Sequence, residues 1–92
     1  MNIRWTPEAV TDLEHISQHI AEDNPDAALK TVRSIFSRIE ELVTFPNRAR
    51  KGREEGTREL VLSPLPYIAV YRVNGPAIEI LHIWHGAQHR NE

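Results

Sequence analysis

The 92-residue sequence has no cysteine, no long apolar run and little net charge. Without cysteine the chain can form neither a disulfide nor a thiolate metal site, which fits a reducing cytosol. No segment approaches the roughly 18 apolar residues that a membrane helix needs, and the first residues lack the apolar core of a signal peptide. A formal net charge of -2 and a pI near 6.2 argue against a strongly basic nucleic-acid binder. We therefore expect a cytoplasmic protein without a membrane partner.

The short length favours one domain, residues 1–92, with no internal repeat or linker. A chain of this size buries only roughly 60 to 65% of the surface that its unfolded form exposes. A protein partner that covers further apolar surface would stabilise it by mass action. A permanent protein partner is therefore expected.

The N-terminal half predicts a strand followed by two helices. Asn2–Trp5 alternates apolar and polar residues, as a short strand does. Thr6-Pro7-Glu8 and Asn24-Pro25-Asp26 both predict helix starts, because each combines a capping side chain, a proline and an acid. Apolar residues then recur at spacings of three and four, until Asp23 in the first helix and Phe45-Pro46 in the second. The tight linker predicts an antiparallel helical hairpin.

The C-terminal half predicts an exposed basic loop and three strands. Residues 46–56 hold four of the eleven basic residues and no aliphatic side chain larger than alanine. The three strands are expected at Thr57–Ser63, Tyr67–Val73 and Ala77–His85. Asn74-Gly75 is a strong hairpin signal, because both residues tolerate positive φ angles. The predicted class is α+β in the order β-α-α-β-β-β, with the hairpin across one face of an antiparallel sheet.

A regular two-residue turn at Asn74-Gly75 fixes an expected register. It pairs Tyr71 with Ile78 and Tyr67 with His82. It places Tyr71, Ile80, His82 and Trp84 on one face of the sheet and Ile68, Arg72, Leu81 and His85 on the other. Both faces are partly apolar, so the helices cannot cover all of this surface, and the remainder is available to a partner. The expected core consists of Leu13, Ile16, Ile20, Val32, Ile35, Phe36, Ile39, Leu60, Leu62, Val70 and Ile80.

The histidines raise the question of a metal or catalytic site. His15 and His19 have the four-residue spacing of a helical metal pair, but no third ligand is evident and we expect a solvated surface. His82 and His85 are three apart in a strand, so their side chains should point to opposite faces and could share a metal only if a bulge intervenes. We therefore expect no metal site.

The end of the last strand places His85, Gln88, His89 and Arg90 near the basic loop. Such a cluster could cleave a phosphodiester without metal, because histidine can move a proton near neutral pH and arginine can stabilise the phosphorane charge. It could equally form the rim of a protein-binding surface. The residues alone favour the protein-binding rim, because catalytic constellations are rarer than exposed basic residues.

Five sequence blocks in a fixed order carry a family resemblance. They are Trp5–Ala9 with Asp12-Leu13, the close of the helical hairpin at Phe45-Pro46, Gly56–Leu60, Tyr67–Val73 and Ile78–Ala87. Together they resemble the ParE/RelE superfamily of toxins from bacterial type II toxin-antitoxin systems, over nearly the whole chain. The resemblance implies a cytosolic growth inhibitor, neutralised by an antitoxin that wraps an extended segment and a helix around it and whose gene normally lies beside that of the toxin. It also implies that higher-order toxin-antitoxin complexes can form and that no cofactor is needed.

Two activities occur within this superfamily. ParE-like members poison DNA gyrase without catalysing a reaction, whereas RelE-like members cut mRNA in the ribosomal A site. Glu79–Leu81 leading to His85-Gly86 resembles the ParE ending. His85 matches a histidine that some mRNA-cleaving members use, but Gly86 replaces their base-stacking aromatic residue. The resemblance therefore implies gyrase as the target, with a ribosome-dependent endoribonuclease as the alternative and an inactive interaction domain as a third possibility.

The expected site residues follow from these interpretations. Contact with the target is assigned to Arg48, Arg50, Lys51, Arg53, Arg58, Arg72 and Arg90. In the nuclease alternative, the catalytic group is Arg58, Arg72, His85 and His89. Contact with the antitoxin is assigned to Tyr71, Leu81 and Trp84. A purely structural role for Arg58 and Arg72 is an ion pair with Glu59 or Glu79.

Overall fold

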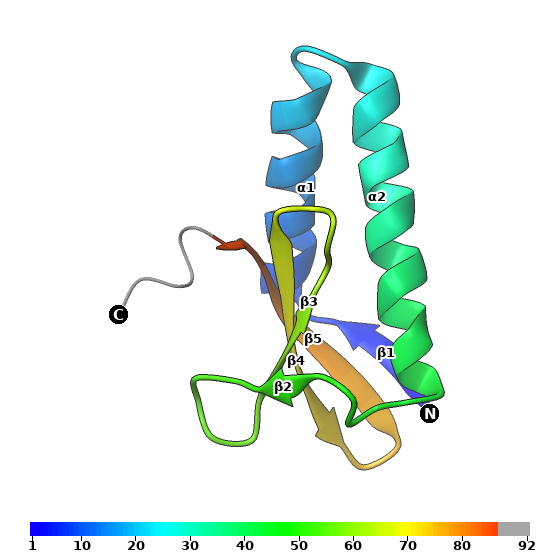
Figure 1. Cartoon of the computed structure of the whole chain (residues 1–92), viewed down its shortest axis with the longest axis vertical. Coiled ribbons are helices and arrows are strands. Elements are labelled where there is room, and N and C mark those ends of the chain that lie inside the picture. The colour runs from blue at the N-terminus through cyan, green and yellow to red at the C-terminus, as the bar shows by residue number, and fades with distance from the viewer. Residues whose placement is uncertain (87–92) are drawn as a thin grey trace.

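The computed structural model describes residues 1–86 and packs a helical hairpin against one face of a five-stranded sheet (Figure 1). The sheet order is β1-β5-β4-β3-β2, with β1 parallel to β5 and the other neighbours antiparallel. The expected α+β class and element order are confirmed. The elements in chain order are β1 (Asn2–Trp5), α1 (Pro7–Ala21), α2 (Pro25–Glu40), the short 3-10 helix η1 (Glu41–Val43), β2 (Arg50–Lys51), β3 (Arg58–Val61), β4 (Tyr67–Asn74) and β5 (Ala77–His85).

Both helices begin where the capping signals predict. The Thr6 hydroxyl accepts from the Ala9 amide at 3.2 Å, and the Asn24 side chain accepts from the Ala27 amide at 3.1 Å. The Thr6 hydroxyl also donates to the Ile80 carbonyl at 2.9 Å. One side chain therefore starts α1 and fixes that start against β5. Among residues 1–86, no helix is both long and apolar enough to cross a membrane.

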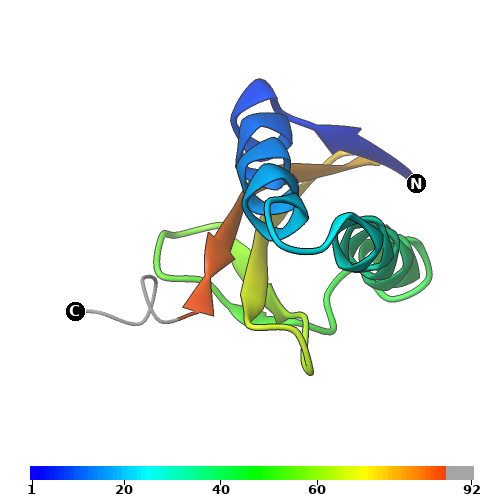
Figure 2. The same ribbon diagram turned by 90° about the horizontal axis from the view of Figure 1, so that it is seen from above.

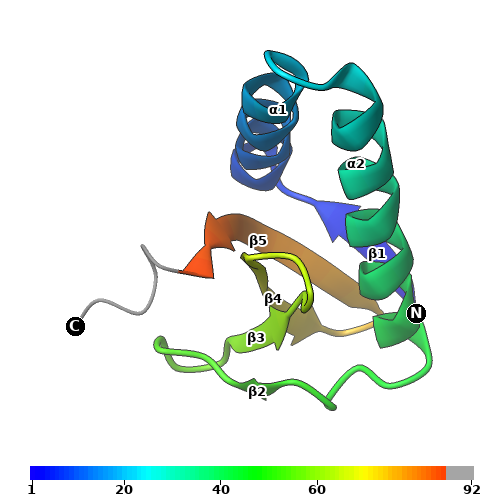
Figure 3. The same ribbon diagram turned by 45° about the horizontal axis from the view of Figure 1, so that its top comes forward.

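The hydrophobic core lies between the helical hairpin and the sheet (Figure 3). Its largest fully buried side chains are Tyr71, Ile35, Ile39, Leu42, Leu62, Ile78 and Ile80. Burying one such aliphatic side chain contributes about 1.5 to 3 kcal/mol. Seen from above, α1 and α2 lie next to each other over this layer (Figure 2).

Several core expectations need adjustment. The Phe36 side chain is not buried: it is 40% exposed and its ring lies against Trp5, with ring centroids 5.0 Å apart. Val70 is buried, but it lies outside the main core cluster. Ile16, Ile20 and Val32 are only partly buried, because they flank the stripe that faces the sheet. The remaining expected core residues are buried.

The basic loop contains a strand that the sequence did not predict. Arg50 and Lys51 form β2, which pairs with Glu59 and Arg58 of β3. Two residues without a β-branched or aromatic side chain give no local strand signal. The pairing comes from the neighbouring strand, so β2 is a product of tertiary structure.

The predicted register of the β4–β5 hairpin was wrong. Its two turn residues are Gly75 and Pro76, with Gly75 at φ +60°, and Asn74 pairs with Ala77. Tyr71 consequently pairs with Ile80 instead of Ile78. A β-bulge then shifts the ladder by one more residue, so that Tyr67 pairs with His85.

The bulge also changes which side chains share a face. Val70 pairs with His82, and Leu81 is the extra residue between this pair and the Tyr71–Ile80 pair. Tyr71 and Ile80 therefore point into the core, whereas His82 points to the other face together with Val70. The predicted grouping of Tyr71, Ile80, His82 and Trp84 on one face was thus right for the first two and wrong for His82 and Trp84, because it assumed strict alternation. The expected separation of His82 from His85 is retained, since the two histidines line different hollows.

Candidate functional site

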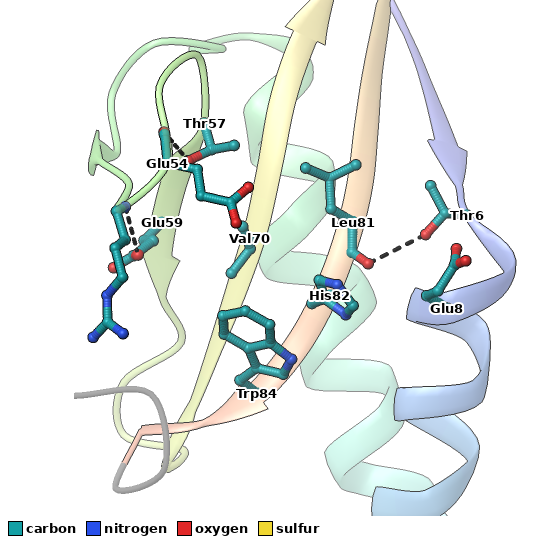
Figure 4. Close-up of a pocket in the computed structure, with 10 residues that line it drawn as sticks. Thr6, Glu8, Glu54, Thr57, Glu59, Val70, Leu81, His82 and Trp84 are labelled. Carbon is teal, nitrogen blue, oxygen red and sulfur yellow. Dashed lines mark hydrogen bonds between the residues drawn. The ribbon is translucent and has the colours of Figure 1, made fainter. Parts of the chain in front are cut away.

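The face of the sheet away from the helices carries a hollow of about 410 Å³ (Figure 4). It lies across β4 and β5, between the start of α1 and the loop that joins β2 to β3. No helix within residues 1–86 lies over this part of the sheet (Figure 3). The hollow is lined by Thr6, Glu8, Arg53, Glu54, Thr57, Glu59, Val70, Leu81, His82 and Trp84.

The floor of the hollow is mainly apolar. Val70, Leu81 and Trp84 supply its apolar surface, and the His82 ring stacks on Trp84 with centroids 4.7 Å apart. Leu81 reaches the hollow because it is the bulged residue of β5. The bulge therefore places an aliphatic side chain and an aromatic pair on one exposed surface.

The floor is fixed to α1 by one carboxylate. Asp12 accepts from the Ile83 amide at 3.0 Å, and its same oxygen lies 3.1 Å from Nδ1 of His82. The Thr6 hydroxyl bonds the Ile80 carbonyl just before the bulge. These contacts fix β5 just before and just after the bulge, so the floor of the hollow is preorganised.

The opposite wall is a loop held to β3. The Glu59 carboxylate accepts from Nη2 of Arg50 at 3.1 Å and from the Arg53 amide at 3.2 Å. The Thr57 hydroxyl donates to the Glu54 carbonyl at 2.6 Å. The loop therefore has a defined shape beside the hollow.

The segment that leads into this loop is fixed from the core side of the sheet. Arg58 donates from Nη1 to the carbonyl oxygens of Asn47 and Ala49, at 3.1 and 2.8 Å. The Tyr71 hydroxyl donates to the Pro46 carbonyl at 2.8 Å. Burial raises the pKa of the Tyr71 phenol, so the neutral donor form is favoured. The side chains of Arg58 and Tyr71 thus fix the path of the backbone at the start of the basic segment.

Arg72 takes part in a separate charge cluster. Its Nε donates to Glu79 at 2.7 Å, and Arg4 lies 3.4 Å from the same carboxylate. The hydrogen bond from Arg72 holds the pKa of the Glu79 carboxyl below its usual value. The structural role that the sequence suggested for Arg72 is therefore present. Arg58 differs, because it bonds backbone carbonyls in place of Glu59 or Glu79.

Arg58 and Arg72 lie on opposite faces of the sheet. Arg58 is paired with Tyr71, whose side chain is in the core, and Arg72 is the next residue of β4. Side chains of cross-strand partners share a face, and successive side chains alternate. The two arginines therefore do not converge on one phosphate, as the nuclease alternative requires.

His85 does not join either arginine. Its ring packs edge-on against Tyr67, with centroids 5.7 Å apart. Tyr67 and Tyr71 are four residues apart on β4, which corresponds to roughly 13 Å along a strand. His85 and Arg58 pair with opposite ends of this stretch. His89, Arg90 and Gln88 lie outside the described residues.

The other basic residues are spread along the loop. Arg48 forms an ion pair with Glu41 at 3.2 Å, and its guanidinium lies 6.0 Å from the centroid of the Phe45 ring. Arg50 pairs with Glu59, as described above, and Lys51 is exposed. Arg53 lies on the rim of the hollow. The loop therefore presents a basic edge, within which several guanidinium groups have acidic neighbours.

The expected antitoxin contacts have different environments. Leu81 and Trp84 line the hollow, where a partner can reach them. Tyr71 is 0% exposed and is hydrogen-bonded inside the core, so it offers no surface to a partner. We therefore do not retain Tyr71 as a contact residue. The sequence did not identify Glu8 and Glu54 as site residues, because they are far apart in the chain and carry no local motif.

A second hollow is lined by three of the remaining histidines. His15 and His19 are exposed, as expected, and line it together with Asp12 and His85. In the described part of the chain, no group of three or more histidine or acidic residues is arranged to hold a metal ion. The arrangement thus adds no third ligand to the His15–His19 pair.

Comparisons with known proteins point in one direction. The family model described as "ParE toxin of type II toxin-antitoxin system, parDE" matches residues 3–90. A Sinorhizobium fredii protein named "Putative toxin Y4kP" is 42% identical over 86 residues, covering 94% of this chain and 88% of that protein. "Toxin RelE2" of Caulobacter vibrioides is 32% identical over 84 residues, covering 91% and 93%.

A solved structure agrees with these sequence relationships. The chain matches a structure described as "Chromosomal ParDE TA system from P. aeruginosa" with a TM-score of 0.83 and 34% sequence identity. The match covers 92% of this chain and 95% of that chain. Sequence and fold therefore agree over nearly the whole length.

Proposed function

The chain belongs to the ParE toxin family of type II toxin-antitoxin systems, and from this premise we propose that it arrests bacterial growth by poisoning DNA gyrase. In this proposal the toxin stabilises the cleaved gyrase–DNA complex and catalyses no reaction of its own. A cognate antitoxin, the partner that the family implies, neutralises it.

One observation favours gyrase over mRNA cleavage. A metal-free nuclease needs cationic groups and an acid or base around one phosphate. Arg72 is engaged by Glu79 on one face of the sheet, while Arg58 is engaged by loop carbonyls on the other. His85 packs against Tyr67 at a distance from both. This separation supports a toxin that acts by binding.

We place the contact with gyrase on the basic loop. Lys51 is exposed, and Arg50 and Arg53 stand beside it on a loop that Glu59 holds in shape. A preorganised loop loses little conformational entropy on binding, which favours affinity. Arg58 contributes by fixing the segment before β2, so it acts as a positioning residue.

We place the antitoxin on the hollowed face of the sheet. Leu81 and Trp84 offer apolar surface there, and both are partly exposed. Exposed apolar surface of this kind is typical of protein-binding sites. The antitoxin thus covers a face that the helical hairpin leaves open.

Expression in a bacterial host tests the proposed target. We expect growth arrest with an induced DNA damage response and intact mRNA, and we expect co-expression of the antitoxin from the adjoining reading frame to restore growth. Primer extension on mRNA from the arrested cells tests the alternative, which is mRNA cleavage. Codon-phased cuts without a DNA damage response would overturn the gyrase proposal in favour of the ribosome-dependent nuclease.

A further inference from the structure

Two carboxylates face the hollow from opposite walls. Glu8 comes from the first turn of α1 and Glu54 from the β2–β3 loop, with Val70 and Leu81 between them (Figure 4). Neither glutamate forms an ion pair or side-chain hydrogen bond within residues 1–86. Both groups therefore remain available to cations.

The lining of the hollow is acidic as a whole. Glu8, Glu54 and Glu59 line it together with Arg53, and because Glu59 is paired with Arg50, the carboxylates of Glu8 and Glu54 set its charge. Both of these carboxylates are exposed to solvent, so a single ion pair with either is weak and their main effect is to speed the association of a cationic partner. Glu54 thus gives the hollow an acidic group from the basic loop of residues 46–56, whose other charged residues are mostly basic.

The floor adds a requirement for apolar surface. Leu81 and Trp84 are partly exposed, and the volume of about 410 Å³ is within the range of sites that hold a small ligand or a few side chains. A purely ionic partner would leave Leu81 and Trp84 in water. The best occupant therefore combines an apolar side chain with cationic groups on either side of it.

We propose that this hollow binds a segment of the antitoxin in which an apolar anchor side chain is flanked by lysine or arginine residues. The inference rests on the proposed neutralisation by an antitoxin and adds the chemistry of the segment that does it. The apolar anchor packs on Leu81 and Trp84, and the flanking cations pair with Glu8 and Glu54.

Charge disfavours nucleic acid as the occupant of the hollow. Nucleic acid presents phosphates, which the exposed carboxylates of Glu8 and Glu54 repel. A cationic, partly apolar protein segment is the class that both the floor and the walls attract.

The test measures binding of the antitoxin encoded by the adjoining reading frame to the toxin and its charge-reversal variants. Glu8→Lys and Glu54→Lys, combined, reverse both walls. Glu14→Lys and Glu55→Lys, combined, are the matched control, because they change the same residue type on α1 and on the same loop but do not line the hollow. Affinity and association rate are measured at low and high salt, and thermal unfolding checks that each variant is folded.

We expect the wall variants to weaken binding by about tenfold at low salt, mainly through slower association, and to reduce its salt dependence. The control pair should change affinity by no more than about twofold. A Leu81→Ser variant should weaken binding without changing the salt dependence. Replacing lysines or arginines of the antitoxin segment by glutamate should restore binding to the wall variants.

The outcomes separate this inference from the proposed function. If wild-type toxin binds the antitoxin tightly but the wall and control variants have the same affinity for it, the proposed role of the hollow is wrong while neutralisation by the antitoxin stands. If the wall variants lose gyrase inhibition and keep antitoxin binding, the hollow belongs to the target and the inference is overturned. If the wild-type toxin neither arrests growth nor binds the antitoxin, the proposed function itself fails.

Discussion

The hydroxyl of Tyr71 donates a hydrogen bond to the carbonyl oxygen of Pro46 at 2.8 Å, from a side chain that is 0% exposed. This bond joins the central strand β4 to the start of the basic segment, 25 residues earlier in the chain. The core of the fold thus sets the position of the segment that we assign to the target.

Tyr71→Phe should lower the free energy of unfolding by about 1 to 2 kcal/mol, because the Pro46 carbonyl loses its partner while the ring remains in place. Urea unfolding measures the difference. Tyr67→Phe is the control, since the Tyr67 hydroxyl forms no hydrogen bond within residues 1–86. Equal stability of Tyr71→Phe and wild type would show that the bond contributes nothing.

Arg58→Ala should free the segment before β2 without unfolding the protein. The variant loses two charge-assisted bonds to the carbonyls of Asn47 and Ala49, at a cost of about 1.5 to 3 kcal/mol. Hydrogen exchange in residues 46–56 should accelerate, and gyrase inhibition should fall with it. Arg72→Ala is the comparison: it disturbs the other face and should leave exchange in the loop unchanged. Lost inhibition with unchanged loop exchange would instead make Arg58 a direct contact.

Acid should weaken the cluster around Glu79. The hydrogen bond from Arg72 lowers the pKa of Glu79 in the folded state, so its contribution is complete above the unfolded-state pKa of about 4.3. The contribution is lost as pH falls from there through the folded-state pKa. Unfolding experiments should show wild type more stable than Glu79→Gln at neutral pH, with the gap closing in acid. A gap that does not change with pH would contradict the assignment.

Thr6→Ala should destabilise the fold by about 1 to 2 kcal/mol, because it removes the cap of α1. It also removes the bond to the Ile80 carbonyl beside the bulge. Thr11→Ala on the exposed side of the same helix should have little effect. Thermal unfolding compares the two variants, and equal melting temperatures would refute the anchoring role of Thr6.

Local sequence signals predicted the elements of this fold but not its irregularities. Thr6 and Asn24 act within three residues of their own position, so their capping roles follow from the sequence. The turn was misplaced by one residue because Gly75 suits a turn at either position, and the ladder decides between them. The short strand β2 likewise forms only because β3 offers a partner.

The candidate site depends on contacts that no short motif encodes. The bulge at Leu81 is held by Thr6 and Asp12, more than 65 residues earlier, which explains why strict alternation misplaced His82 and Trp84. Leu81 and Trp84 were nevertheless predicted as partner-facing, and they line the hollow. Glu8 completes the site only after the chain has folded.

The most direct test of the proposed function adds purified toxin to DNA gyrase and plasmid. The account predicts that the toxin inhibits supercoiling or produces linear DNA, that prior addition of the antitoxin prevents both effects, and that Arg58→Ala is a weaker inhibitor than wild type. Unchanged supercoiling and no linear DNA at a molar excess of toxin, with a folded and antitoxin-binding preparation, would contradict it.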